Sequence, residues 1–111
     1  MFRHVALWKF ADDEPGPNRE HAIKVKTALE ETAYEIHGLV RVDVHIDAVK
    51  TSASNADIFM ECVFEDRDAF RSFLDSSRYK AVKELLDDVV GERLAMDFED
   101  APEDDDPGAF I

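Results

Sequence analysis

The first ten residues, Met1-Phe-Arg-His-Val-Ala-Leu-Trp-Lys-Phe10, decide how the rest of the chain is arranged. Side chains of a β-strand alternate between its two faces, so this stretch is read in steps of two. One face is aromatic and apolar apart from a single imidazole: Phe2, His4, Ala6, Trp8 and Phe10. The other carries Val5 and Leu7 between two basic residues. A strand with apolar side chains on both faces is normally covered on both, so we expect it in the interior of its sheet.

The spacing of apolar residues divides the remaining chain into two helices and three strands. A three-to-four spacing over 19–36 predicts a helix capped by Asn18, with Gly38 in the left-handed conformation that ends it. Period-two alternation predicts strands over 39–49, 56–65 and 93–99. A second helical pattern follows Asp66, is interrupted near Ser76, where we expect a break or kink, and ends at Gly91.

This order, βαββαβ, is the ferredoxin-like topology and predicts an α+β fold. We expect a four-stranded antiparallel sheet with two helices on one face, the first and third strands inside and the other two at the edges. In the last strand we expect three apolar side chains to point inward: Leu94, Met96 and Phe98. The opposite face has no helix left to cover it, although it carries Val5, Leu7, Phe59 and Val63. A second copy of the chain is the simplest cover, so we predict a homodimeric α/β barrel.

Composition limits the possible partners. The net charge of −13 disfavours nucleic acid and anionic membrane surfaces, both of which require clustered Lys and Arg. We see no apolar run long enough to span a membrane and no secretory signal, and the single cysteine, Cys62, fits a reducing cytoplasm. We expect one domain over 1–99 followed by an acidic tail over 100–111.

Four short stretches resemble the stress-responsive A/B barrel domain (Dabb) family. They are the opening strand through Phe10, Ile36-His-Gly38, Ala53-Ser-Asn-Ala-Asp57, and Phe64-Glu-Asp-Arg-Asp-Ala-Phe70. Their order and spacing carry the resemblance, which runs from Met1 to about Glu99. It implies a dimeric α+β barrel, the same assembly that the uncovered face predicts.

The resemblance implies no single activity. One plant relative is a polyketide cyclase whose chemistry is attributed to a Tyr–His pair, with the first-strand His lining the same pocket. By position the Tyr falls on Phe73, the His on Tyr79 and the first-strand His on His4. Phe73 has no proton to exchange, and the family's His-Pro-x-His pattern reads Ser76-Ser-Arg-Tyr79 here. The cyclase activity is therefore not transferred.

Two interpretations of His4 stay open. It is either a general base that works with Tyr79, or a neutral core imidazole that donates to a backbone carbonyl or a carboxylate. Five apolar residues are candidates for the lining of a ligand pocket, or for ordinary core: Ala6, Trp8, Met60, Phe70 and Phe73. We expect no cofactor and no metal, because the sequence has no H-x-H, HExxH or CxxC motif and no glycine-rich phosphate loop.

Two functions of different class follow. The first is a dimeric module that binds a small hydrophobic ligand and is associated with stress. The second is a cofactor-independent enzyme, cyclase-like or monooxygenase-like, that uses His4 as a base on a small hydrophobic carbonyl compound. The enzyme hypothesis predicts a void of a few hundred Å³ beside His4 and the Tyr79 hydroxyl within about 6 Å of the imidazole.

Overall fold

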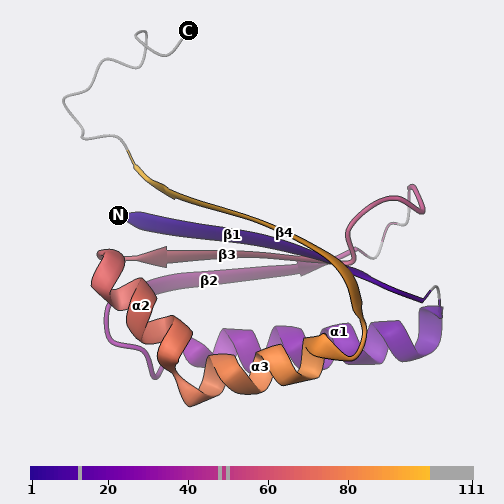
Figure 1. Cartoon of the computed structure of the whole chain (residues 1–111), viewed down its shortest axis with the longest axis horizontal. Helices are drawn as coiled ribbons and strands as arrows, with labels where there is room; N and C mark the ends of the chain where they lie inside the picture. Colours follow the sequence, from indigo (N-terminus) through magenta and orange to yellow (C-terminus); the bar gives the residue numbers. More distant parts are fainter. Residues whose placement is uncertain (13, 48, 50, 101–111) are drawn as a thin grey trace, which may run out of the picture.

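The computed structural model describes residues 1–12, 14–47, 49 and 51–100, so the tail predicted over 100–111 lies outside it except for Asp100. The elements, in chain order, are β1 (Phe2–Phe10), α1 (Pro15–Thr32), β2 (Leu39–Ile46), β3 (Ile58–Phe64), α2 (Arg67–Asp75), α3 (Ser77–Asp87) and β4 (Val90–Glu99). The strands form one antiparallel sheet in the order β2-β3-β1-β4 (Figure 1). The predicted ferredoxin-like topology is confirmed, with β1 and β3 inside.

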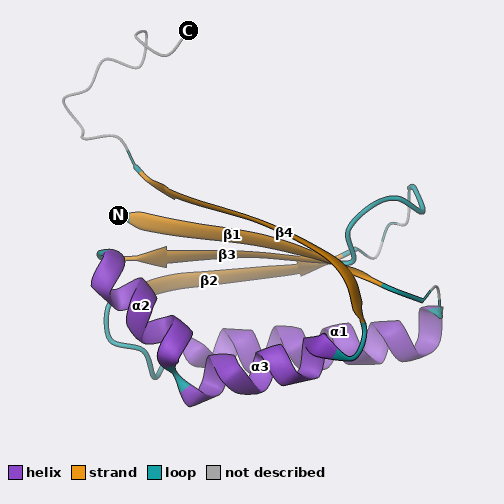
Figure 2. Ribbon diagram, in the orientation of Figure 1, coloured by secondary structure: helices purple, strands orange, loops and turns teal. Residues whose placement is uncertain are grey.

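The three helices of the described chain pack on one face of the sheet, and none of the described helices covers the other face (Figure 2). The five helix-facing side chains of β1 are buried. They pair across the sheet with the helix-facing side of β3, where Ile58, Met60, Cys62 and Phe64 are almost fully buried. The core therefore lies between the two central strands and the helices, as the alternation of β1 predicted.

The first helix is shifted toward the N-terminus relative to the prediction. It begins at Pro15, because proline is favoured in the first helical turn, where its missing N–H is not needed. Asn18 therefore lies inside the helix, and its side chain donates to the Asp12 carbonyl at 2.6 Å. The helix ends at Thr32, and Gly38 takes its predicted left-handed conformation (φ +84°) in the turn before β2.

The predicted break in the second helix lies at Ser76, which separates α2 from α3. Its hydroxyl donates to the Phe73 carbonyl at 2.7 Å and accepts from the Tyr79 N–H at 3.1 Å, so it caps the start of α3. Asp66 caps α2 in the same way, by accepting from the Ala69 N–H at 2.8 Å. The break turns α3 so that Tyr79, in its first turn, faces the sheet and is 5% exposed.

Three predictions about β4 are wrong. The strand begins at Val90 rather than residue 93, and Gly91 is a bulge residue inside it rather than the helix terminator. The pairing register aligns Leu94 with Leu7 and Met96 with Val5, which places the apolar side chains of β4 on the uncovered face. They do not point inward: Leu94 is 71% exposed and Met96 64%.

The edge strand β2 is also irregular. The register shifts between Leu39 and Arg41, so that Val40 is an extra residue and is 53% exposed. The shift keeps Leu39 and Val44 on the helix-facing side, where both are buried. Strand β2 ends at Ile46, earlier than the predicted end at residue 49.

Candidate functional site

The site begins with a hydrogen bond between side chains of two neighbouring strands. β1 and β4 are antiparallel, and their register sets His4 directly opposite Asp97 on the helix-facing side. The His4 Nδ1 forms a short hydrogen bond with the Asp97 Oδ1. The imidazole is 3% exposed and the carboxylate is 46% exposed, so the pair extends from the core to the protein surface.

The Asp97 contact decides what the other ring nitrogen of His4 can do. A carboxylate only accepts hydrogen bonds, so Nδ1 carries the proton and Nε2 presents a lone pair. Nε2 is buried and has no hydrogen-bond partner among the described residues. Phe70 of α2 packs on the ring, with the ring centroids 5.0 Å apart. Because a buried unpartnered nitrogen is costly, this acceptor is suited to a group that the protein itself does not supply.

A groove opens beside this pair. It lies between β4 and α2, has a volume of about 430 Å³, and is called here the β4–α2 groove. Its lining comprises Phe2, Arg67, Phe70, Arg71, Leu74, Asp97, Phe98 and Glu99. Two of these residues, Phe70 and Asp97, also contact the His4 ring. A compound in the groove would therefore be one side chain away from the imidazole.

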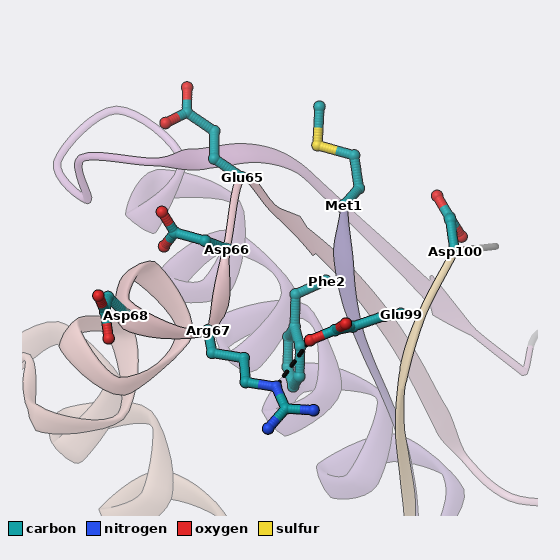
Figure 3. Close-up of a pocket in the computed structure, with 8 residues that line it drawn as sticks. All are labelled: Met1, Phe2, Glu65, Asp66, Arg67, Asp68, Glu99 and Asp100. Carbon is teal, nitrogen blue, oxygen red and sulfur yellow. Dashed lines mark hydrogen bonds and ion pairs between the residues drawn. The ribbon is translucent and has the colours of Figure 1, made fainter. Parts of the chain in front are cut away.

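A second hollow of about 380 Å³ lies next to the ion pair between Arg67 and Glu99. Figure 3 shows Arg67 reaching from α2 to Glu99 of β4, with Nε and Oε1 2.7 Å apart. Both residues, with Phe2, line this hollow and the β4–α2 groove alike. The remaining lining of the second hollow is Met1, Glu65, Asp66, Asp68 and Asp100. Five of the eight lining residues are therefore carboxylates, and only Met1 and Phe2 are apolar.

Tyr79 lies on the same side of the sheet. Burial raises the pKa of its hydroxyl, an effect that the nearby Arg93 guanidinium opposes and the Asp97 carboxylate reinforces. A raised pKa keeps the phenol protonated at neutral pH, so Tyr79 can donate a hydrogen bond but cannot act as a base.

The structure does not bring all five predicted pocket residues to an open surface. Phe70 lines the β4–α2 groove, and its exposure is partial. The other four are in the buried core: Ala6, Trp8, Met60 and Phe73, each 3% exposed or less. Phe73 packs against Tyr79, with the ring centroids 4.5 Å apart, and so supports it from behind.

Asp97 was not among the predicted site residues. Its signal was present, since the predicted topology already makes the first and fourth strands neighbours. No group of three or more His, Cys, Asp or Glu side chains suited to a metal ion occurs in the described part of the chain. No helix among the described residues combines the length and apolar character needed to cross a bilayer.

Comparison with known proteins shows which of them share this fold. The sequence matches none of the curated proteins. Its structure is similar to a dimeric protein of unknown function and ferredoxin-like fold from Bacteroides fragilis, with 19% identity, a TM-score of 0.80, and coverage of 88% of this chain and 94% of the other. A dimeric ferredoxin-like protein of unknown function from Thermobifida fusca is 25% identical, with a TM-score of 0.73 and coverage of 87% and 88%.

An antibiotic biosynthesis monooxygenase is similar as well, at 14% identity and a TM-score of 0.70, with coverage of 92% of this chain and all of the other. These likenesses show the fold. The model of one family, the stress responsive A/B barrel domain, matches residues 2–100. The chain therefore belongs to the stress responsive A/B barrel domain family.

Proposed function

We propose that this protein is a homodimeric α+β barrel that binds a small hydrophobic carbonyl compound in the β4–α2 groove. The observation that carries the proposal is the buried Nε2 of His4, which is unpartnered within the described residues while Asp97 holds the opposite nitrogen. The groove, whose lining includes the Asp97 and Phe70 that contact the His4 ring, has the volume of a small organic molecule and an apolar side formed by Phe2, Phe70 and Leu74.

The uncovered sheet face supports the homodimer. It presents Leu94 and Met96 largely exposed, next to the partly exposed Val5 and Leu7. Contiguous apolar surface of this kind marks an interface in most proteins. Two solved relatives of the same fold, from Bacteroides fragilis and Thermobifida fusca, are described as dimeric.

The chemistry of His4 narrows the ligand class. A lone pair on Nε2 requires a hydrogen-bond donor, and a simple ketone has none. The enol form of a β-dicarbonyl compound, or a phenol or quinol, combines such a donor with a flat apolar body. We therefore expect compounds of this kind to bind more tightly than ketones that cannot enolise.

The binding proposal can be tested with benzoylacetone, which enolises, and its 2,2-dimethyl derivative, which cannot. We expect benzoylacetone to raise the melting temperature, since a ligand specific for the folded state stabilises it by mass action. Asp97→Asn replaces an acceptor by a side chain that can donate to Nδ1, which would move the proton to Nε2. We expect it to weaken benzoylacetone binding about tenfold, the value of one hydrogen bond between neutral groups.

The matched control is Asp87→Asn, which removes the same charge at an exposed position of α3 outside the groove. It should bind benzoylacetone like the wild type. Equal melting shifts from both diketones, or no shift from either, would contradict the proposal.

Proton abstraction is a second candidate, favoured by the pairing of His4 with a carboxylate. The α-carbon of a ketone would transfer its proton to Nε2, giving an imidazolium paired with Asp97 and an enolate that accepts a hydrogen bond from Tyr79. The test is deuterium incorporation into the methyl group of acetophenone in D₂O, followed by NMR. Enzyme-dependent exchange that is lost in Asp97→Asn and kept in Asp87→Asn would support it, and exchange at the buffer rate would exclude it.

An oxidative reaction of a quinol, by analogy with the monooxygenase of the same fold, is a variant of this candidate. An association with stress rests on the family to which the chain belongs. Both are tested separately: the first by oxygen consumption with a naphthoquinol, the second by transcript levels under oxidative or osmotic stress.

A further inference from the structure

The lining of the β4–α2 groove combines apolar and basic side chains. Its apolar side is formed by Phe2, Phe70 and Leu74, and Leu74 is 36% exposed although its side chain is large and apolar. Its basic groups are the guanidinium groups of Arg67 and Arg71. These two arginines are four residues apart on α2, so they lie on the same face of the helix, about one turn apart. The groove therefore suits a partner that has carboxylates and apolar side chains close together.

The two arginines keep hydrogen-bond donors for such a partner. Their side chains are 67% and 73% exposed. Arg67 contacts Glu99 through its Nε at 2.7 Å, and Arg71 has a looser contact with Asp68 of its own helix, at 3.6 Å. A guanidinium group carries five N–H donors, so one carboxylate does not exhaust it. The lining also contains two carboxylates, Asp97 and Glu99, and both are engaged, the first by the imidazole of β1.

The C-terminal segment of the chain has the matching combination. Residues 101–111 lie outside the described residues and read Ala-Pro-Glu-Asp-Asp-Asp-Pro-Gly-Ala-Phe-Ile. Four consecutive carboxylates at 103–106 are followed by Pro107-Gly108 and then by three apolar residues, Ala109 to Ile111. A Pro-Gly pair is favoured at the centre of a type II turn, which reverses the chain. The segment therefore joins an acidic run to an apolar end through a predicted turn.

The segment also begins next to the groove. Asp100 is held by its N–H, which donates to the Met1 carbonyl at 3.1 Å, and by its carboxylate, which accepts from the Arg3 Nε at 2.7 Å. The residue before it, Glu99, is part of the groove lining. Eleven extended residues span at most about 36 Å, whereas residues 67–74 span only about 10 Å of α2. The segment is therefore long enough to run along α2 and turn back.

We propose that residues 103–111 fold back and occupy the β4–α2 groove of their own subunit, with the acidic run at Arg67 and Arg71 and with Phe110 and Ile111 on the apolar side. A segment tethered beside its site has an effective concentration on the order of millimolar, which favours its own groove over that of a second copy. The five carboxylates of the second hollow would repel the same acidic run.

The consequence for the groove is competition, because a ligand that enters it has to displace the segment. The inference goes beyond the proposed function and does not depend on it, since the segment covers the groove whether or not a ligand exists. It can therefore be tested on the protein alone.

A nitroxide spin label on the segment tests this contact in the full-length protein. Ala109→Cys supplies the attachment point, and the native Cys62 does not compete for the label at neutral pH, because it is buried and the pKa of its thiol is raised to about 12. We expect the label to reduce the amide NMR intensities of residues 70–74 and 97–99, relative to the chemically reduced label. The amides of residues 52–55, in the loop at the opposite end of the sheet, should keep their intensity (Figure 1).

Variants in the labelled protein identify the groups that hold the segment. Arg67→Gln/Arg71→Gln should restore the intensities of the groove amides, and Phe110→Ser should restore them in part. The matched control is Arg19→Gln/Lys24→Gln, which removes the same charge at exposed positions of α1 outside the groove. It should leave the loss of intensity in place.

The inference is wrong if the label on residue 109 does not reduce the groove amide intensities, or if the loss persists in Arg67→Gln/Arg71→Gln. Equal recovery in the α1 control would show that overall charge, not the groove arginines, holds the segment. A loss seen when labelled ¹⁴N copies are mixed with unlabelled ¹⁵N copies would assign the segment to the groove of a second copy and overturn the proposal for its own subunit. No ligand enters these experiments, so the proposed binding function is tested separately.

Discussion

Replacing the two most exposed apolar side chains of β4 with carboxylates tests the proposed dimer. In the double variant Leu94→Asp/Met96→Asp, both changes fall on the uncovered sheet face, opposite Leu7 and Val5 of β1. Neither side chain is part of the helix-facing core, since they are 71% and 64% exposed in a single chain. The fold of each subunit should therefore survive, and only association should suffer.

The magnitude follows from the area that the partner would cover. Complete burial of a Leu or Met side chain contributes about 1.5–3 kcal/mol. Covering the roughly two-thirds of each side chain that is exposed contributes about 1–2 kcal/mol, and a two-fold interface contains each position twice. The double variant should thus lose about 4–8 kcal/mol of dimerisation free energy, which raises the dimer dissociation constant by about three orders of magnitude or more.

Sedimentation velocity across a concentration series measures this directly. We expect dimers for the wild type at micromolar concentration and monomers for the double variant, with the circular dichroism spectrum unchanged. The control is Tyr34→Asp, which adds a carboxylate at a 91% exposed aromatic residue beyond α1 and should leave the dimer intact. Wild-type monomers at micromolar concentration, or a double variant that still dimerises like the wild type, would refute the reasoning.

Three further predictions concern stability. Gly38→Ala should lower the free energy of unfolding by about 1–3 kcal/mol in urea titrations, because φ is +84° and an added Cβ would lie 2.6 Å from the Ala69 Cβ. Ser76→Ala should cost about 1 kcal/mol through loss of the α3 cap, while Ser77→Ala next to it should be nearly neutral. Burial raises the pKa of the Cys62 thiol from its ordinary value of 9.0 to about 12. Between these two pH values the thiol is ionised in the unfolded state and protonated in the folded state. The free energy of unfolding should therefore be unaffected by this thiol below pH 9.0 and should fall as the pH rises from 9.0 to about 12. That part of the decline should disappear in Cys62→Ala, and an unchanged slope would contradict it.

The topology could be predicted from the sequence because β1 and β3 carry apolar side chains on both faces. A strand with apolar side chains on both faces is normally covered on both, so central positions were predicted for these two strands. The break at Ser76 was equally visible, since a serine that interrupts an apolar stripe offers its hydroxyl to the backbone. Both features depend on local pattern alone.

Other features depend on pairing, which alternation does not encode. The apolar residues of β4 were assigned to the core because a single chain normally buries its apolar face. In this fold Leu94 and Met96 belong to the other face instead. Because Leu94 and Met96 lie on the uncovered face, Asp97 lies on the helix-facing side opposite His4, and this pairing creates the site. The bulge at Val40 was hidden for the same reason, because one extra residue changes which side chains point inward.

The central claim is that Asp97 holds His4 with a free lone pair on Nε2, ready to accept a hydrogen bond from a ligand. The ¹⁵N NMR resonances of the His4 ring report this directly at neutral pH. We predict a protonated Nδ1 and an unprotonated Nε2, with the Nε2 resonance moving when benzoylacetone is added and not when its 2,2-dimethyl derivative is added. A proton on Nε2, or a resonance that neither diketone moves, would contradict the account.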